Sequence, residues 1–281
     1  MSAPVDIEDG VATFRHDAAL VARYHFGRDA ARPYLEPLFA PGGARVTRAP
    51  DEVEDHPHHH GVWIGHRDVD GIDHWTGFPG HGRIVHRGFG PARGAALDER
   101  LTWVRPDGTP QLEERRTLRL LDEHALDVEV RLRADHGALA LGDDKDAAMI
   151  AVRVAPTMQA DRGGEIVLAG GRRGERECWG AAAPWADYAG PAPGGGVAGV
   201  AVLDHPGNPR HPTRWHVRDY GLLCANPFGS RSFGDAVDGT LRIAAGDELR
   251  FRFRLIAHRG DAEGAAIDAA YTQFAGATAA A

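Results

Sequence analysis

The sequence predicts an all-β fold, an antiparallel two-sheet β-sandwich with a short C-terminal helix. Two segments, 126–133 and 249–255, alternate apolar and charged side chains at every position. That pattern is typical of strands with one buried and one solvated face. The chain also contains 36 glycines and 18 prolines among its 281 residues. Such frequent breakers shorten the elements between them, which favours strands over helices.

Further strands are expected between turn sequences such as Pro41-Gly42-Gly43 and Pro106-Asp107-Gly108. In chain order they are 11–15, 20–26, 61–66, 84–89, 115–121, 148–155, 199–203 and 241–244. Near the C-terminus, Ile267, Tyr271 and Phe274 are spaced as one face of a helix, which predicts a helix over about 261–275. Strand patterns continue on both sides of the Gly/Pro-rich loop 191–196, so residues 1–281 are expected to form a single β-sandwich domain.

The composition excludes several classes of protein. The formal net charge of −8 argues against a general nucleic-acid binder, which would carry a basic face. The chain has no run of 18 apolar residues, and its acidic start lacks a signal-peptide core, so neither a membrane partner nor secretion is expected. Two cysteines, Cys178 and Cys224, are too few for a disulfide framework. Reduced thiols and a cytoplasmic location are predicted, and a homo-oligomer is left open.

Histidine is concentrated in one segment, since eight of the 16 histidines lie between positions 56 and 86. If residues 56–60 are extended, His56, His58 and His60 point to one side and His59 to the other. Neutral imidazoles in this arrangement could hold a divalent Zn, Fe, Mn or Ni ion. Alternatively, the segment forms a metal-free pocket whose histidines act as acid or base, or a turn with incidental imidazoles.

A second run of polar and aromatic side chains covers residues 204–228. In an extended segment, Arg214, His216 and Arg218 would share one side of the chain. Aromatic rings mixed with charged groups are typical of loops that stack on a sugar and orient its hydroxyls. The alternative is that the rings belong to the core. The same two interpretations apply to Trp179. Lys145 is the only lysine in the chain, and two explanations are open: selection for a chemical role, or an arginine-rich composition.

Several short motifs together resemble the bacterial DUF6807 family, also described as methane oxygenase PmoA-like. They are Arg32-Pro33-Tyr34, the segment 55–63 (DHPHHHGVW), Cys178-Trp179-Gly180, Asp204-His205-Pro206, the segment 215–221 (WHVRDYG) and Asn226-Pro227-Phe228-Gly229. The family resembles galactose-mutarotase-like supersandwich proteins and accompanies sugar oxidoreductases and isomerases. The resemblance therefore implies a supersandwich fold and a carbohydrate ligand. His60 stands where an arginine is usual in the family.

The main hypothesis is a carbohydrate-active enzyme, a hydrolase, lyase or isomerase, that hydrolyses, eliminates or epimerises a sugar or an oxidised glycoside. Its pocket would be formed by the 55–68 and 205–226 segments. The catalytic candidates are His58, His59, His216 and, as an orienting partner, Asp219. The substrate-binding candidates are His66, Trp179, His205, Arg214, Arg218, Tyr220 and Asn226. Two alternatives stay open: a metal-dependent hydrolase or oxygenase with His56, His58 and His60 as ligands, and a noncatalytic sugar-binding module. No cofactor is expected apart from the divalent metal of the first alternative.

Overall fold

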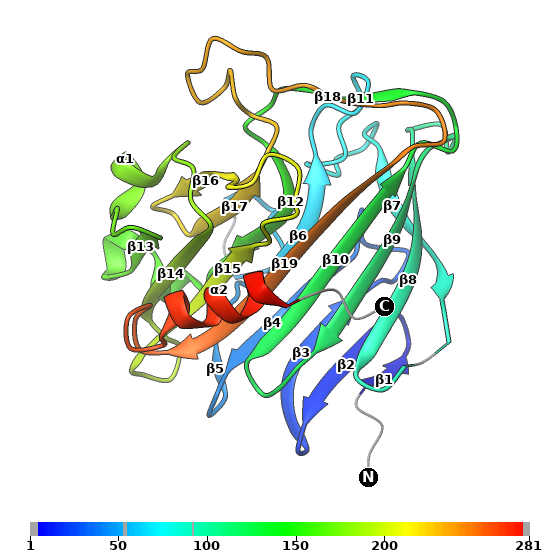
Figure 1. Ribbon diagram of the computed structural model, residues 1–281. Helices are drawn as coiled ribbons and strands as arrows, with labels where there is room; N and C mark the ends of the chain where they lie inside the picture. The colour runs from blue at the N-terminus through cyan, green and yellow to red at the C-terminus, as the bar shows by residue number, and fades with distance from the viewer. Residues whose placement is uncertain (1–4, 53–54, 92, 278–281) are drawn as a thin grey trace.

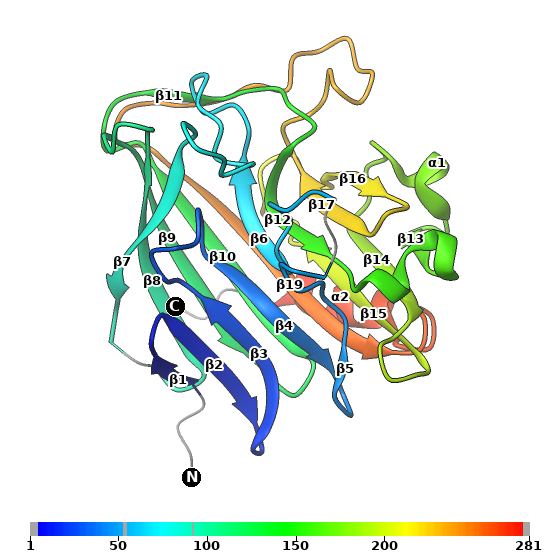
Figure 2. The ribbon, with the colours of Figure 1, turned by 180° about the vertical axis from the view of Figure 1, so that it is seen from behind.

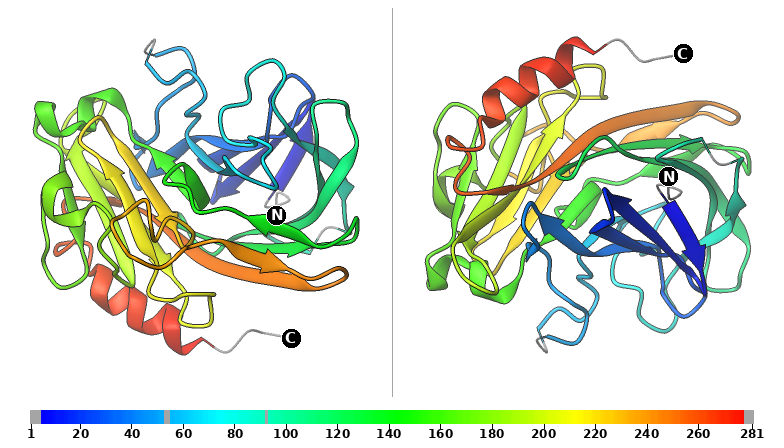
Figure 3. Two further views of the ribbon diagram at one scale, coloured as in Figure 1. Left: turned by 90° about the horizontal axis from the view of Figure 1, so that it is seen from above. Right: turned by 90° about the horizontal axis from the view of Figure 1, so that it is seen from below.

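Two large antiparallel β-sheets face each other in the computed structural model, which describes residues 5–52, 55–91 and 93–277. Figure 1 shows the chain with the sheet that contains residues 125–133 and 248–259 toward the viewer, and the two views of Figure 3 show the sheets as separate layers. The predicted all-β, two-sheet architecture with a short C-terminal helix is confirmed.

The first sheet has nine strands and carries the candidate site. In spatial order its strands are β1 (Val5–Glu8), β2 (Val11–His16), β3 (Ala19–His25), β4 (Tyr34–Ala40), β6 (Val62–His66), β12 (Ala147–Arg153), β17 (Leu222–Asn226) and β16 (Arg214–Arg218), with β5 (Ala44–Arg45) paired to β4. Strands β6, β12 and β17 are far apart in the sequence but lie side by side, and β16 forms a hairpin with β17 (Figure 2).

The second sheet has eight strands, in the order β13 (Glu165–Leu168), β14 (Trp185–Pro191), β15 (Val197–Asp204), β19 (Glu248–Arg259), β10 (Ala125–Arg133), β9 (Pro110–Leu120), β8 (Ala96–Val104) and β7 (Arg83–Phe89). The remaining elements are the strand pair β11 (Leu139–Leu141) and β18 (Leu241–Ile243), the 3₁₀ turns η1 (Pro156–Met158) and η2 (Ala160–Arg162), and the helices α1 (Gly174–Cys178) and α2 (Ile267–Gly276). None of the helices among these described residues is long and apolar enough to cross a membrane.

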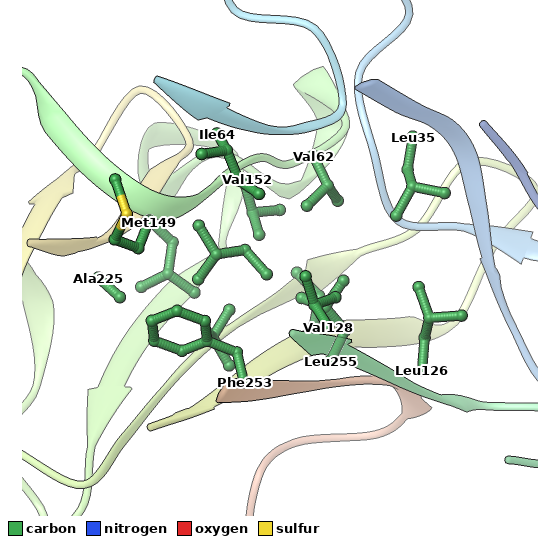
Figure 4. Close-up of a cluster of buried hydrophobic side chains, with 14 of the residues drawn as sticks. Leu35, Val62, Ile64, Leu126, Val128, Met149, Val152, Ala225, Phe253 and Leu255 are labelled. Carbon is green, nitrogen blue, oxygen red and sulfur yellow. The ribbon is translucent and has the colours of Figure 1, made fainter. Parts of the chain in front are cut away.

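The main core lies between the two sheets. On β10 and β19, Val128 is paired with Phe253 and both side chains are buried, while the alternate arginines and carboxylates face outward. Figure 4 shows these side chains packed against Val62 and Ile64 of the first sheet. The alternation read from the sequence therefore places one face of each strand in this core.

The predicted strands all coincide with observed ones, but several observed strands had no clear signal. Strand β17 reads Leu-Leu-Cys-Ala-Asn and is buried along its whole length, so it lacks the alternation that marks a half-exposed strand. Strand β4 contains Pro37, a residue that weakens a strand prediction. Helix α2 begins at Ile267 rather than near 261, because turns occupy 262–266 and Ala266 has a positive φ of 53°.

Candidate functional site

A row of side chains crosses the outer face of the nine-stranded sheet, the face turned away from the main core. His216 on β16 is paired with Cys224 on β17, Cys224 with Ala151 on β12, and Ala151 with Trp63 on β6. These residues are buried outside the main core, in part beneath Trp75. Since neighbouring strands are about 4.8 Å apart, His216 and Trp63 lie roughly 14 Å apart across the row.

The histidine segment 55–60 is a turn, so the condition of an extended segment, on which the alternation of its histidines depended, is not met. His56 has a positive φ of 45°, and the His59 amide donates to the His56 carbonyl at 2.9 Å. The buried Arg48 guanidinium donates to the carbonyls of Asp55, His56 and His59 at 2.9, 2.7 and 3.0 Å. One arginine thus gathers three carbonyls, and the chain must curl around it instead of alternating its histidines along a strand.

Four stacked rings join the histidine segment to the second sequence motif. Trp63 stacks on His59, His59 on His56, and His56 on Tyr220, with ring centroids 4.9, 4.8 and 4.7 Å apart. The guanidinium of Arg153 lies over the Tyr220 ring at 4.5 Å. The structure therefore brings together the two segments that the sequence singled out, with Tyr220 as the point of contact.

His59 is held by its surroundings. Arg153 donates to His59 Nδ1 at 3.0 Å and to Asp55 at 2.6 Å. Burial, together with the neighbouring positive groups, lowers the pKa of His59 far below its usual value. Burial raises the pKa of Asp55, but the hydrogen bonds from Arg153 and His56 outweigh it and lower that pKa to about 2. His59 is therefore a neutral hydrogen-bond acceptor for an arginine.

His58 lines a cavity of about 530 Å³, which we call the histidine cavity. Its wall comes from segments 29–32, 57–60 and 76–83 together with Pro106, and it includes Arg32, Pro57, His58, His60, Thr76, Phe78 and His81. The Phe78 ring meets His58 edge-on at 5.5 Å. Within the described part of the chain, the buried Nδ1 of His58 has no hydrogen-bond partner. Burial and the positive charge of Arg32 lower the pKa of His58 to about 4.

Arg32 is the main charged group of this cavity. Its side chain donates to the His58 carbonyl and lies over the Trp63 ring at 5.7 Å. The residue is only 5% exposed, and burial lowers its pKa to about 9. A buried guanidinium that contacts a carbonyl and a ring retains donors for a polar ligand.

A second group of polar side chains lies at the other end of the row, around His216. His216 Nδ1 bonds the Lys145 carbonyl at 2.7 Å, which requires a proton on Nδ1 and leaves a lone pair on Nε2. Among the described residues this buried Nε2 has no partner. Asp146 accepts hydrogen bonds from Lys145 at 2.8 Å and Arg67 at 2.9 Å. Burial lowers the pKa of His216 to about 4.

The carboxylate nearest to His216 is therefore Asp146, 3.9 Å from Nδ1, and not the predicted Asp219. Asp219 is exposed, and its backbone is held by Glu175 and by the Tyr188 hydroxyl. The signal for Asp146 was its neighbour Lys145, the only lysine of the chain. Its approach to His216 depends on a long-range contact that no local pattern reveals.

Three predicted binding residues have other partners. His205 bonds Arg252 at 2.8 Å and packs against Phe274 of α2, on the side of the second sheet. Asn226 donates to the carbonyls of 144 and 145 and accepts from the amides of 228 and 229, so its amide is fully used in holding loops. His66 is fully buried against Phe228.

The remaining predicted residues lie on β16 or beside it. Arg218 bonds Glu175 at 2.6 Å and lies over Trp179 at 5.4 Å. Arg214 donates to the Gly180 carbonyl at 2.7 Å, and with Trp179 it lines a separate cavity of about 620 Å³. In contrast, Trp185 and Tyr188 are buried and belong to the packed interior.

The proposed metal-ligand set of His56, His58 and His60 is not assembled in the described residues. His60 Nε2 bonds the Pro57 carbonyl at 2.6 Å, while His56 lies in the ring stack. No group of three or more histidine, cysteine, aspartate or glutamate side chains in the described segments is arranged to hold a metal ion.

Comparison with solved structures finds distant similarity to sugar-active proteins. A galactose 1-epimerase from Lactobacillus acidophilus is 9% identical, with 92% of this chain and 100% of the other covered and a TM-score of 0.41. A putative aldose 1-epimerase from Klebsiella pneumoniae is 10% identical, with coverages of 95% and 81% and a TM-score of 0.39. An α-galactosidase from Geobacillus stearothermophilus in complex with stachyose is 14% identical with a TM-score of 0.39; the match covers 92% of this chain but only 41% of that protein.

The comparison with curated proteins found no match. A protein-family comparison matches residues 12–272, nearly the whole of both sheets. The chain therefore belongs to the family of unknown function DUF6807.

Proposed function

We propose that the protein is a carbohydrate-active enzyme in which His58 acts as a general acid–base group. The observation that carries the proposal is His58 Nδ1, a buried nitrogen without a partner among the described residues in a side chain that lines the histidine cavity. A pKa of about 4 keeps this imidazole neutral at pH 7, so it is ready to accept a proton from a substrate hydroxyl or from an acidic carbon.

The lining of the cavity suits a sugar. Its volume of about 530 Å³ is within the range of small-molecule sites, roughly 300–1,000 Å³. Phe78 is 46% exposed and offers an apolar ring to a sugar face, while Arg32 and Thr76 offer donors to hydroxyls. Hydrolysis, elimination and epimerisation all need a proton to be taken from one atom and returned to another. Protonated His58, with its low pKa, would return the proton readily.

His216 is proposed as a second proton-transfer group with Asp146 as its partner. Its Nδ1–H is held by the Lys145 carbonyl, so the free lone pair is on Nε2. Burial and the charges of Arg32 and His56 lower the pKa of His58, and the charge of Asp146 acts in the opposite direction. A substrate that extends from the histidine cavity toward Asp146 would contact both His58 and His216.

The test compares His58→Ala and His216→Ala with His124→Ala, a control in the exposed turn before β10. Turnover and binding are measured on glucosides and their 3-keto derivatives. We expect kcat to fall about 100-fold or more in the first two variants, with binding nearly retained, and no change in the control. Unchanged turnover in His58→Ala contradicts the proposal. A wild type that binds sugars without turnover shows a binding module instead, and stoichiometric metal in elemental analysis favours the metal-dependent alternative.

A further inference from the structure

A row of four arginines crosses the outer face of the eight-stranded sheet. Arg100 on β8 is paired with Arg115 on β9, Arg115 with Arg131 on β10, and Arg131 with Arg250 on β19. Like charges directly opposite on neighbouring strands destabilise a sheet. The chain is acidic overall, with a net charge of −8, so a general excess of arginine over acidic residues does not explain this row.

The two rows beside it extend the positive surface. Together the three rows, which we call the arginine face, contain Arg100, Arg115, Arg119, Arg131, Arg250, Arg252, Arg254, Asp98, Asp127 and Glu129. Seven arginines stand against three carboxylates, a formal charge of +4. Glu113 and Glu248 border the face on one side. Helix α2 packs over β15 and also contacts Ala125 of β10 and Ile256 of β19 (Figure 1). Its Phe274 ring borders the arginine face, beneath the guanidinium of Arg254 at 4.9 Å.

Part of the arginine face already binds carboxylates in a forked geometry. Arg250 donates two hydrogen bonds to Glu129, at 2.9 and 2.7 Å. Arg254 donates two to Asp127, at 2.6 and 3.0 Å. In contrast, the exposed arginines 100, 115 and 119 have neither an ion pair nor a side-chain hydrogen bond within the described ranges. Their forks are available to carboxylates from outside.

The surface is hollowed along these arginines. A cavity of about 540 Å³ is lined by Arg93, Arg100, Arg115 and Arg131, and an adjoining one of about 250 Å³ by Arg119, Arg250, Arg252 and Arg254. Both are also lined by Thr117 and Glu129, so the two cavities adjoin, and we call the pair the arginine groove. The carboxylates in its wall are already engaged: Asp98 accepts from the Thr117 hydroxyl at 2.6 Å, and Glu99 is buried and bonded to His86 at 2.6 Å.

We propose that the arginine face binds an acidic polysaccharide, a chain of uronate sugars whose carboxylates pair with Arg100, Arg115 and Arg119. The argument is charge complementarity: a positive, elongated groove with free forks on an otherwise acidic protein fits a flexible chain of carboxylates. The choice of a glycan over another polycarboxylate rests on the proposed function. The arginine groove shares no lining residue with the histidine cavity, so binding here needs no turnover.

The experiment measures binding of polygalacturonate by calorimetry, with dextran as the neutral polymer and poly-glutamate as the acidic peptide. The double variant Arg100→Gln/Arg115→Gln is compared with Arg15→Gln/Arg23→Gln, which changes the charge equally on exposed residues of the first sheet. We expect polygalacturonate but not dextran to bind the wild type. Affinity should fall about 10- to 100-fold in the first variant and not in the second, and rising salt should weaken it.

Thermal melting accompanies the binding experiment, since removing opposed like charges should leave the double variant as stable as the wild type or more so. Equal affinity in Arg100→Gln/Arg115→Gln, or poly-glutamate bound as tightly as polygalacturonate, overturns the inference. Loss of polygalacturonate binding in His58→Ala also overturns it, because the ligand would then occupy the histidine cavity. If no sugar is turned over but polygalacturonate binds as described, the proposed function fails and this inference stands.

Discussion

The imidazole of His56 stacks on the ring of Tyr220 at a centroid distance of 4.7 Å, although one residue precedes β6 and the other follows β16. This contact crosses β12 and β17, which lie between those two strands in the sheet. It closes the stack of four rings and places the second sequence motif against the histidine segment. The position of His58 at the cavity wall depends on this packing, because His58 follows His56 in the same turn.

Replacement of Tyr220 tests whether its ring stabilises the fold through its contacts with His56 and Arg153. Tyr220→Ala removes the stack on His56 and the contact with Arg153, so we expect the free energy of unfolding to fall by about 1–2 kcal/mol. Sugar binding should weaken as the turn loosens. Tyr220→Phe keeps the ring and is the matched control. Urea denaturation measures the difference, and equal stability of the two variants would argue against a structural stack.

Asp55 should contribute more to the free energy of unfolding than a surface carboxylate without buried partners. It pairs with Arg153 at 2.6 Å and with Arg48 at 3.1 Å, and both arginine side chains are fully buried. Asp55→Asn leaves two buried positive charges less well compensated, and we expect a loss of about 2 kcal/mol, discounted because Asp55 itself is half-exposed. Asp51→Asn, at an exposed neighbouring position, is the control. Similar denaturation midpoints for both variants would refute this role.

Stability should decrease on mild acidification. Burial lowers the pKa of His66 to about 3 and that of His216 to about 4, whereas the unfolded chain binds these protons near pH 6.5. Stability from these two groups is therefore complete above about pH 6.5 and is lost as pH falls toward 4, at roughly 1.4 kcal/mol per pH unit for each. Burial lowers the pKa of His258, but the hydrogen bond with Asp187 and its charge outweigh burial and raise that pKa, so His258 has the opposite sign and offsets part of the loss. Urea denaturation at pH 7, 6 and 5 should show that the free energy of unfolding falls with pH. A denaturation midpoint that stays the same at all three pH values would contradict this prediction.

Both cysteines should be unreactive in the native protein. Cys178 and Cys224 are buried free thiols, and burial raises both pKa values, that of Cys178 to about 11. Thiolate is the reactive form, so little of it is present at pH 8. Ellman's reagent should label neither thiol until denaturant is added and then label two. Rapid labelling of the native protein would show that the outer face near Cys224 opens.

Much of the fold was predictable because the second sheet is half-exposed. Its strands carry outward charges on alternate residues, and this alternation marked 126–133 and 249–255 directly. The buried strand β17 has no such mark, since both of its faces are covered. The pairing of β6 with β12 and of β12 with β17 is a property of the whole sandwich and has no local signal.

The candidate site was only partly predictable for a similar reason. The unusual density of histidine identified the turn 55–60, and the second motif identified Tyr220 and His216. The sequence did not reveal that Arg48 would curl the turn or that Asp146 would approach His216. Arg32 was noted only as part of a family motif, and Phe78 was missed, because single residues in separate loops have no shared pattern until the fold places them around one cavity.

The most direct test of the central claim is a crystal structure of the protein with a sugar or 3-keto glycoside that it turns over, trapped in the His58→Ala or His58→Gln variant. The account predicts the sugar in the histidine cavity, with a reacting hydroxyl or carbon at the place that His58 Nδ1 reaches within about 3 Å in the wild type. A sugar bound elsewhere, with the histidine cavity unoccupied, would contradict it, as would a metal ion held by the histidine segment.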